Sequence, residues 1–297
     1  MSTRSPLADF LRARRSALRP EQVGLTTAGT RRRVPGLRRE EVADRAKISR
    51  DYYLRVEQGH DITPSDQVLS ALAHALDLDE FERAYLFRLA RPLPPLRGPG
   101  SRTAAPSMES LLEHWPMTPA FAFDRNLDVL ATNDLLRRIA PDKGVPGANL
   151  LLSVAEGYVR AREDGIPADQ LEAWDSIFRE LIAALRFYSD PDDPRLQEIV
   201  GECSVRYRLF RSVWAEYEVR PITQRALRID VAPFGWLDFD MQTFESAVAP
   251  GHYVVTYLAR AGTPAAAAID HFAALRPAAR RTEADVTANA APAVPER

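Results

Sequence analysis

The sequence predicts an N-terminal all-α domain of five helices followed by a C-terminal α+β domain built on an antiparallel sheet. Apolar residues recur at helical spacing in residues 1–90, and alternation typical of strands begins near residue 120. Five prolines and two glycines in residues 91–107 favour an extended linker. We therefore predict domains at 1–90 and 108–276, joined by a linker at 91–107 and followed by a disordered tail at 277–297.

Each helix of the first domain has a signal in the sequence. We predict the five helices at about residues 7–18, 38–46, 50–58, 66–76 and 80–89. Ser49 is placed to cap the third helix with its hydroxyl, and Gly59 suits the left-handed conformation that ends it. The second and third helices are therefore short and are separated by a tight turn.

The second domain combines strands and helices. Strands are predicted at residues 120–124, 127–132, 227–231, 237–242 and 253–258, and helices at 167–188, 194–203 and 205–217. The helix from Pro167 to Tyr188 is strongly amphipathic. Because the last three strands have short connections, we expect an antiparallel meander closed by helices on one face.

The net charge of −2 hides an uneven distribution along the 297 residues. Residues 1–60 hold 14 Arg or Lys against 7 Asp or Glu, whereas the remainder holds 25 against 34. This distribution indicates that the basic N-terminal part binds a polyanion and that the acidic remainder does not.

Composition favours a cytoplasmic globular protein. The chain is 45% hydrophobic and 27% charged, without an apolar stretch long enough for a transmembrane helix or a signal peptide. Its single cysteine, Cys203, excludes an internal disulfide, which is typical of a reducing compartment. We expect no membrane partner.

The segment from Leu37 to Gly59, LRREEVADRAKISRDYYLRVEQG, has the pattern of two helices joined at Ala46-Lys47-Ile48. It resembles the helix-turn-helix of phage-repressor-like regulators, the XRE family, over about residues 5–90. That family commonly has Gly where this chain has Lys47, so we expect Lys47 at positive φ. Small bundles of this pattern also serve as protein-binding modules, but the basic surplus favours DNA.

The resemblance implies where DNA would be contacted, because this fold lays the start of its recognition helix in the major groove. Arg50 and Arg55 could each bind guanine, and Asp51 could accept from cytosine or orient Arg55. The predicted DNA contacts are Ser49, Arg50, Asp51, Tyr52 and Arg55 on the recognition helix, Arg39 at a phosphate, and Arg31, Arg32, Arg33 and Arg38 along the backbone. The expected partner is double-stranded DNA, a palindromic operator read by a homodimer at the nucleoid.

A narrower resemblance extends into the second domain. The segments GTRRRVPGLRREEVADRA, TPAFAFDRNLDVLATN, DPDDPRLQEIVGE and YVVTYLARAGTP are similar to MmyB-like transcription regulators. That resemblance implies a PAS-like domain that binds a fatty-acid-like molecule. The chain departs from the pattern at residues 220–229, where relatives tend to show a Lys and a His-Pro pair.

The second domain has enough aromatic and aliphatic surface for an apolar pocket. The same residues could instead fill the domain's own core. The predicted ligand contacts are Phe121, Phe123, Leu130, Trp174, Phe178, Leu181, Arg206, Phe210 and Trp214. An alternative is that this domain only dimerises or docks a partner, without a ligand.

The sequence does not favour an enzyme. Its five histidines are scattered, and it contains no GxSxG, P-loop or GxGxxG motif. Asp190, Asp192 and Asp193 lack the Gly and Glu of a calcium loop, so we interpret them as a helix-starting turn. Cys203 could sense oxidants, although its neighbours favour a buried helical position. We expect no metal and no cofactor.

Overall fold

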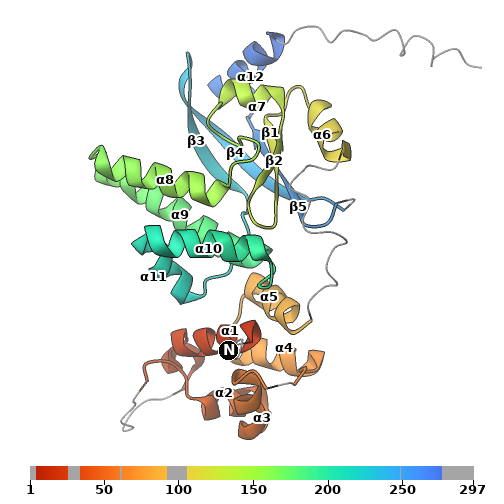
Figure 1. Ribbon diagram of the computed structural model, residues 1–297, viewed down its shortest axis with the longest axis vertical. Helices are drawn as coiled ribbons and strands as arrows, with labels where there is room; N and C mark the ends of the chain where they lie inside the picture. Colours follow the sequence, from red (N-terminus) through yellow and green to blue (C-terminus); the bar gives the residue numbers. More distant parts are fainter. Residues whose placement is uncertain (1–4, 26–33, 61, 92–105, 248, 276–297) are drawn as a thin grey trace, which may run out of the picture.

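The computed structural model describes residues 5–25, 34–60, 62–91, 106–247 and 249–275. The run Arg31–Arg33, most of the predicted linker and the predicted tail lie outside these residues. Figure 1 shows the two parts of the chain stacked end to end, the helical part at the bottom and the sheet at the top.

The first part confirms the prediction of five α-helices. Ser49, Ser65 and Asp79 each accept a hydrogen bond from a backbone N–H in the first turn that follows, so side chains fix the starts of three helices. Phe10 and Tyr53 are fully buried in the core between the helices. The elements are α1 (Pro6–Ala17), the 3-10 helix η1 (Pro20–Val23), α2 (Arg39–Ala46), α3 (Arg50–Glu57), α4 (Asp66–Ala75) and α5 (Glu80–Ala90).

The second part confirms the α+β prediction and its antiparallel sheet. Its helices are α6 (Pro106–Glu113), α7 (Asp134–Ile139), α8 (Leu150–Glu163), α9 (Ala168–Tyr188), α10 (Pro194–Arg206), α11 (Arg208–Glu216) and α12 (Pro264–Ala274). Its strands are β1 (Ala120–Asp124), β2 (Val129–Thr132), β3 (Arg225–Val231), β4 (Gly235–Glu245) and β5 (His252–Leu258). The predicted meander is present, because β3 pairs with β4 and β4 with β5.

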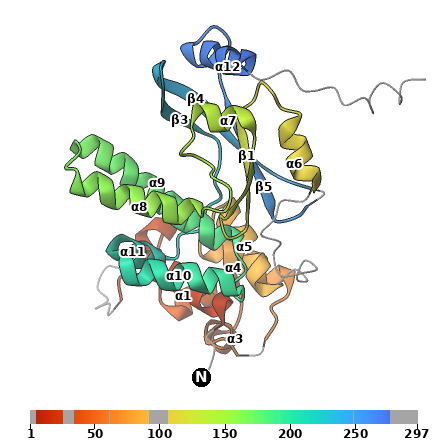
Figure 2. The same cartoon turned by 45° about the horizontal axis from the view of Figure 1, so that its top comes forward.

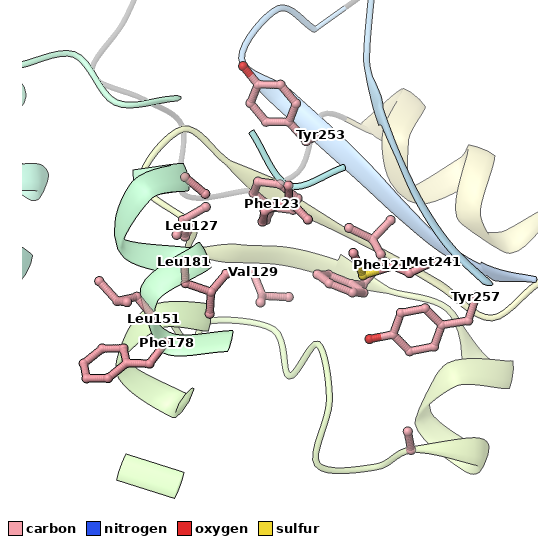
Figure 3. Packing of buried hydrophobic residues seen from close by; sticks show 14 of the residues in the cluster. Phe121, Phe123, Leu127, Val129, Leu151, Phe178, Leu181, Met241, Tyr253 and Tyr257 are labelled. Atoms are coloured by element: carbon pink, nitrogen blue, oxygen red, sulfur yellow. The ribbon is translucent and has the colours of Figure 1, made fainter. Parts of the chain in front are cut away.

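One pairing joins the ends of the domain. β1 pairs with β5, with Phe121 opposite Val255, so the sheet order is β2-β1-β5-β4-β3. On one face of the sheet, Phe121 and Phe123 pack against side chains of α9 such as Leu181 (Figure 3). This face holds the larger of the two cores of the second domain.

The expectation that helices close only one face of the sheet is wrong. Met108 and Leu112 of α6 pack on the opposite face against Ala120 and Ala122 of β1. Small alanines on that face of β1 let the helix approach closely. The sequence analysis also missed α6, α7, α8 and α12. Of these, α12 is rich in alanine, so its apolar periodicity is weak.

The two parts pack directly on each other. Val219, which follows α11, is 3% exposed and belongs to the core of the first part. Figures 1 and 2 both place α3 at the end of the molecule away from the sheet. The contact with the second part therefore leaves α3 uncovered.

Candidate functional site

The turn between α2 and α3 is tight although it lacks glycine. Lys47 has φ 56° and ψ 38°, as the sequence analysis expects, and its N–H donates to the carbonyls of Ala43 and Asp44. The hydroxyl of Ser49 accepts from the N–H of Tyr52 at 3.2 Å. The two helices therefore meet in the arrangement of a helix-turn-helix.

A buried carboxylate ties three helices together. Glu57 of α3 is fully buried, and its Oε1 accepts from Nε of Arg15 in α1 at 2.5 Å. Its Oε2 accepts from Nε of Arg39 in α2, and the hydroxyl of Tyr53 lies 3.4 Å from Oε1. Burial, followed by the nearby Glu57, raises the pKa of Tyr53, which keeps that hydroxyl protonated as a donor. In the sequence, Glu57 stands out only as part of the segment from Leu37 to Gly59, with no role assigned to it.

The network leaves Arg39 half exposed. Its side chain is 50% accessible although Nε is bound to Glu57, so its terminal nitrogens can still face a phosphate. Arg38 is the N-cap residue of α2, and its guanidinium lies 3.6 Å from Glu40. Arg31–Arg33 lie outside the described residues.

The predicted base-reading residues share α3. Ser49, Arg50, Asp51 and Arg55 are exposed, whereas Tyr52 is half-buried and packs against the first domain's core. Arg50 is 65% exposed and lies 3.5 Å from the carboxylate of Glu40, an ion pair weak enough to be exchanged for a base. The structure thus brings these residues together on one uncovered helix; whether they contact DNA stays a prediction.

The second part contains a cavity of about 480 Å³ between α8 and the junction of α10 with α11. It is lined by Glu156, Val159, Arg160, Arg206 and Tyr207. Tyr207 is 6% exposed, and its buried hydroxyl has no hydrogen-bond partner within the described part of the chain. Burial raises the pKa of Tyr207, so the hydroxyl remains a donor. Such an orphaned donor needs a partner.

A second cavity, of about 630 Å³, lies where α6, β2, α7 and α12 meet. Leu130, Trp115 and Phe272 line it together with charged groups of both signs, such as Glu113 and Arg137. Charged groups of both signs thus line this cavity, as Glu156 and Arg160 do beside Tyr207.

The predicted ligand residues are divided among different places. Phe121, Phe123, Phe178, Leu181 and Phe210 lie together in the larger core, four of them labelled in Figure 3. The other predicted contacts lie apart: Arg206 lines the first cavity, Leu130 lines the second, Trp174 approaches Gly157 of α8, and Trp214 stacks on Phe210. Whether any of them contacts a ligand stays a prediction.

A polar cluster that the sequence analysis missed closes the β1–β2 turn. Asp128 accepts from both Nε and Nη2 of Arg195 at 2.9 Å, and Asn149 donates to Asp128 at 2.8 Å. Asp124 accepts from the backbone N–H groups of Asn126 and Asp128. Burial raises the pKa of Asp124 to about 6. The carboxylates of Asp124 and Asp128 both find donors within the cluster, so we interpret it as structural.

The remaining candidates have structural roles. Asp193 caps α10, which confirms the interpretation of a helix-starting turn. Burial raises the pKa of Cys203 to about 12, so its thiol stays protonated and poorly nucleophilic. No group of three His, Cys, Asp or Glu side chains that could hold a metal occurs among the described residues. No helix in that part of the chain is long and apolar enough to span a bilayer.

A helix-turn-helix joined to an α+β domain that carries cavities is the arrangement of a transcription regulator with a ligand-binding domain. A family model of the helix-turn-helix domain matches residues 6–86, and the model of the MmyB-like transcription regulator ligand binding domain matches residues 104–271. The second match covers more than half of the sequence, so the chain belongs to the MmyB-like transcription regulator family. No curated protein matches the chain significantly.

Proposed function

We propose that this regulator binds a specific palindromic operator as a homodimer, and that a small, largely apolar molecule in its second domain changes its affinity for that operator. The observation that carries the proposal is the cavity beside Tyr207 in a chain whose α3 is uncovered. The protein would act in the cytoplasm, on the nucleoid.

The exposed arginines of α3 support DNA reading. Arg50 and Arg55 lie on the exposed face of α3, and each guanidinium can bind O6 and N7 of one guanine. Arg39, held by Glu57, is suited to a phosphate, which would fix the depth of α3 in the groove.

The cavity supports an amphiphilic ligand. Val159 and the ring of Tyr207 offer apolar surface at the cavity. Arg160 and Arg206 line the same cavity as Glu156, and Arg206 is paired with Glu202 at 2.6 Å. Arg160 is then the group best placed to bind an anionic end group such as a carboxylate. A fatty-acid-like molecule combines these features.

The test is a reciprocal titration. Genome-wide binding-site mapping would first identify the operator. Delipidated protein is then titrated with straight-chain carboxylates of eight to sixteen carbons, with and without operator DNA. We expect a coupling of about 1–3 kcal/mol, with operator changing carboxylate affinity by the same factor as carboxylate changes operator affinity.

Two outcomes separate the parts of the proposal. Binding that is absent, or equal in both conditions, would leave the second domain as an assembly module without a ligand. Failure of any DNA sequence to compete better than random DNA would refute the operator half, whatever the carboxylates do.

A further inference from the structure

Two helices connect the cavity to the first domain. α11 begins directly after Tyr207 and ends next to Tyr217, which packs against the core of the first domain. The ring of Phe178, in the middle of α9, meets the ring of Tyr207 edge-on at 5.9 Å, and Phe187 lies near the C-terminal end of α9. A displacement of Tyr207 would therefore act directly on both α9 and α11.

The far ends of α9 and α11 are inserted into the first domain. Phe187 meets Phe81 of α5 edge-on, with ring centroids 6.2 Å apart. Val219 is buried in the first domain's core, and Nη2 of Arg14 in α1 donates to the carbonyl of Glu216 at 2.8 Å. We call this contact the joint: Phe187 and Glu216–Val219 of the second domain against α1 and α5.

Arg186 is buried and Arg88 half-buried at the joint, and neither guanidinium forms an ion pair with a carboxylate among the described residues. Arg186 lies 3.8 Å from the ring centroid of Trp214 and 4.1 Å from that of Tyr217, and it donates to the Trp214 carbonyl. Arg88 stacks on Phe187 at 5.1 Å, and its Nη2 is buried and unpartnered among the described residues. Removing these guanidinium groups from water costs free energy, whereas the apolar and cation–π contacts of the joint are stabilising. The cost offsets part of the stabilisation, which makes the docked state easier to open.

We propose that the joint holds the recognition helix in one orientation relative to the second domain, and that a ligand beside Tyr207 opens or resets the joint through α9 and α11. The inference rests on the proposed function for its ligand. Because α3 lies at the opposite end of the first domain, the docked form can bind DNA. The joint is a two-state element that both sites can bias.

The docking itself is tested without a ligand, by hydrogen exchange in the full chain. Phe81→Ala removes the edge contact with Phe187 across the joint. Phe87→Ala is the matched control, since Phe87 lies on the same helix but stacks under Arg83 of its own domain at 5.4 Å. We expect amides of residues 216–220 to exchange at least about tenfold faster in Phe81→Ala and unchanged in Phe87→Ala. Equal exchange in both variants would overturn the joint.

The route is tested with dodecanoate as the probe. Operator affinity is measured with and without dodecanoate, in native protein and in Phe81→Ala. We expect the ratio of the two affinities to be closer to one in Phe81→Ala than in native protein. Because Phe81→Ala weakens the docked form, calorimetry in the absence of DNA should show dodecanoate binding to Phe81→Ala at least as tightly as to native protein. An unchanged ratio in Phe81→Ala overturns the route while leaving the proposed function intact. If dodecanoate does not bind native protein, the ligand part of the proposed function and the route through the joint are both overturned. The hydrogen-exchange experiment then tests only whether the two domains dock through the joint.

Discussion

At the scale of single residues, Arg39 and Arg50 are held differently. Arg39 is bound to buried Glu57, whereas Arg50 forms an ion pair with the exposed Glu40. An arginine held in place is suited to bind a phosphate, and a loosely paired arginine is suited to bind a base edge. We therefore expect substitution of Arg39 to change overall DNA affinity and substitution of Arg50 to change sequence discrimination.

We predict that Arg50→Ala reduces discrimination between operator and random DNA by about 1–3 kcal/mol, because a base contact is lost. Arg39→Ala should weaken both complexes alike. Competition binding measured by fluorescence anisotropy separates the two effects. Equal losses on operator and random DNA for Arg50→Ala would contradict its assignment.

Asp124 predicts a pH dependence of stability. Its folded pKa of about 6 lies above the unfolded value of about 3.9, so the native state holds the proton more tightly. That contribution is fully present below about pH 4 and is lost as the pH rises through 6, a difference of about 3 kcal/mol. Asp124→Asn keeps an acceptor for the two backbone N–H groups and removes the charge.

The measurement is urea unfolding of both proteins between pH 4 and 8. The variant should be the more stable at pH 7, and the difference between the two free energies of unfolding should shrink toward pH 4. Parallel profiles would show that the charge of Asp124 does not decide stability in this range.

At the scale of elements, the Glu57 network holds α1, α2 and α3 in one arrangement. Glu57→Gln removes the charge that compensates the buried guanidinium of Arg15 and should cost about 3 kcal/mol of unfolding free energy. Glu40→Gln is the control, because the pairs that Glu40 forms with Arg38 and Arg50 among the described residues are exposed. It should cost less than about 1 kcal/mol. Similar losses in the two variants, measured by denaturant unfolding, would refute the special role of the network.

The positions of most helices and strands could be predicted from the sequence, whereas the pairing between distant strands could not. The starts of α3, α4 and α5 follow from local caps that a sequence displays. The pairing of β1 with β5 joins residues more than 120 positions apart, and no local pattern specifies it.

At the scale of the whole molecule, the proposed homodimer must present two α3 helices to one operator. Half-sites should then lie about 10 base pairs apart, or a multiple of that. With roughly six phosphate contacts in the dimer, the logarithm of the binding constant should fall with a slope of about −5 against the logarithm of salt concentration. Light scattering of the free and operator-bound protein checks the dimer; a monomer in both states would contradict it.

The sequence by itself determined the helix-turn-helix, its capped recognition helix, the left-handed Lys47 and the α+β class of the second domain. These follow from short-range physics: capping hydroxyls, side-chain periodicity and positive φ at a turn. Only the tertiary structure decided that Glu57 joins three helices, that five of the predicted ligand residues pack into one core, and that Val219 enters the first domain. Each of these depends on contacts between segments distant in sequence, which packing, rather than local preference, selects.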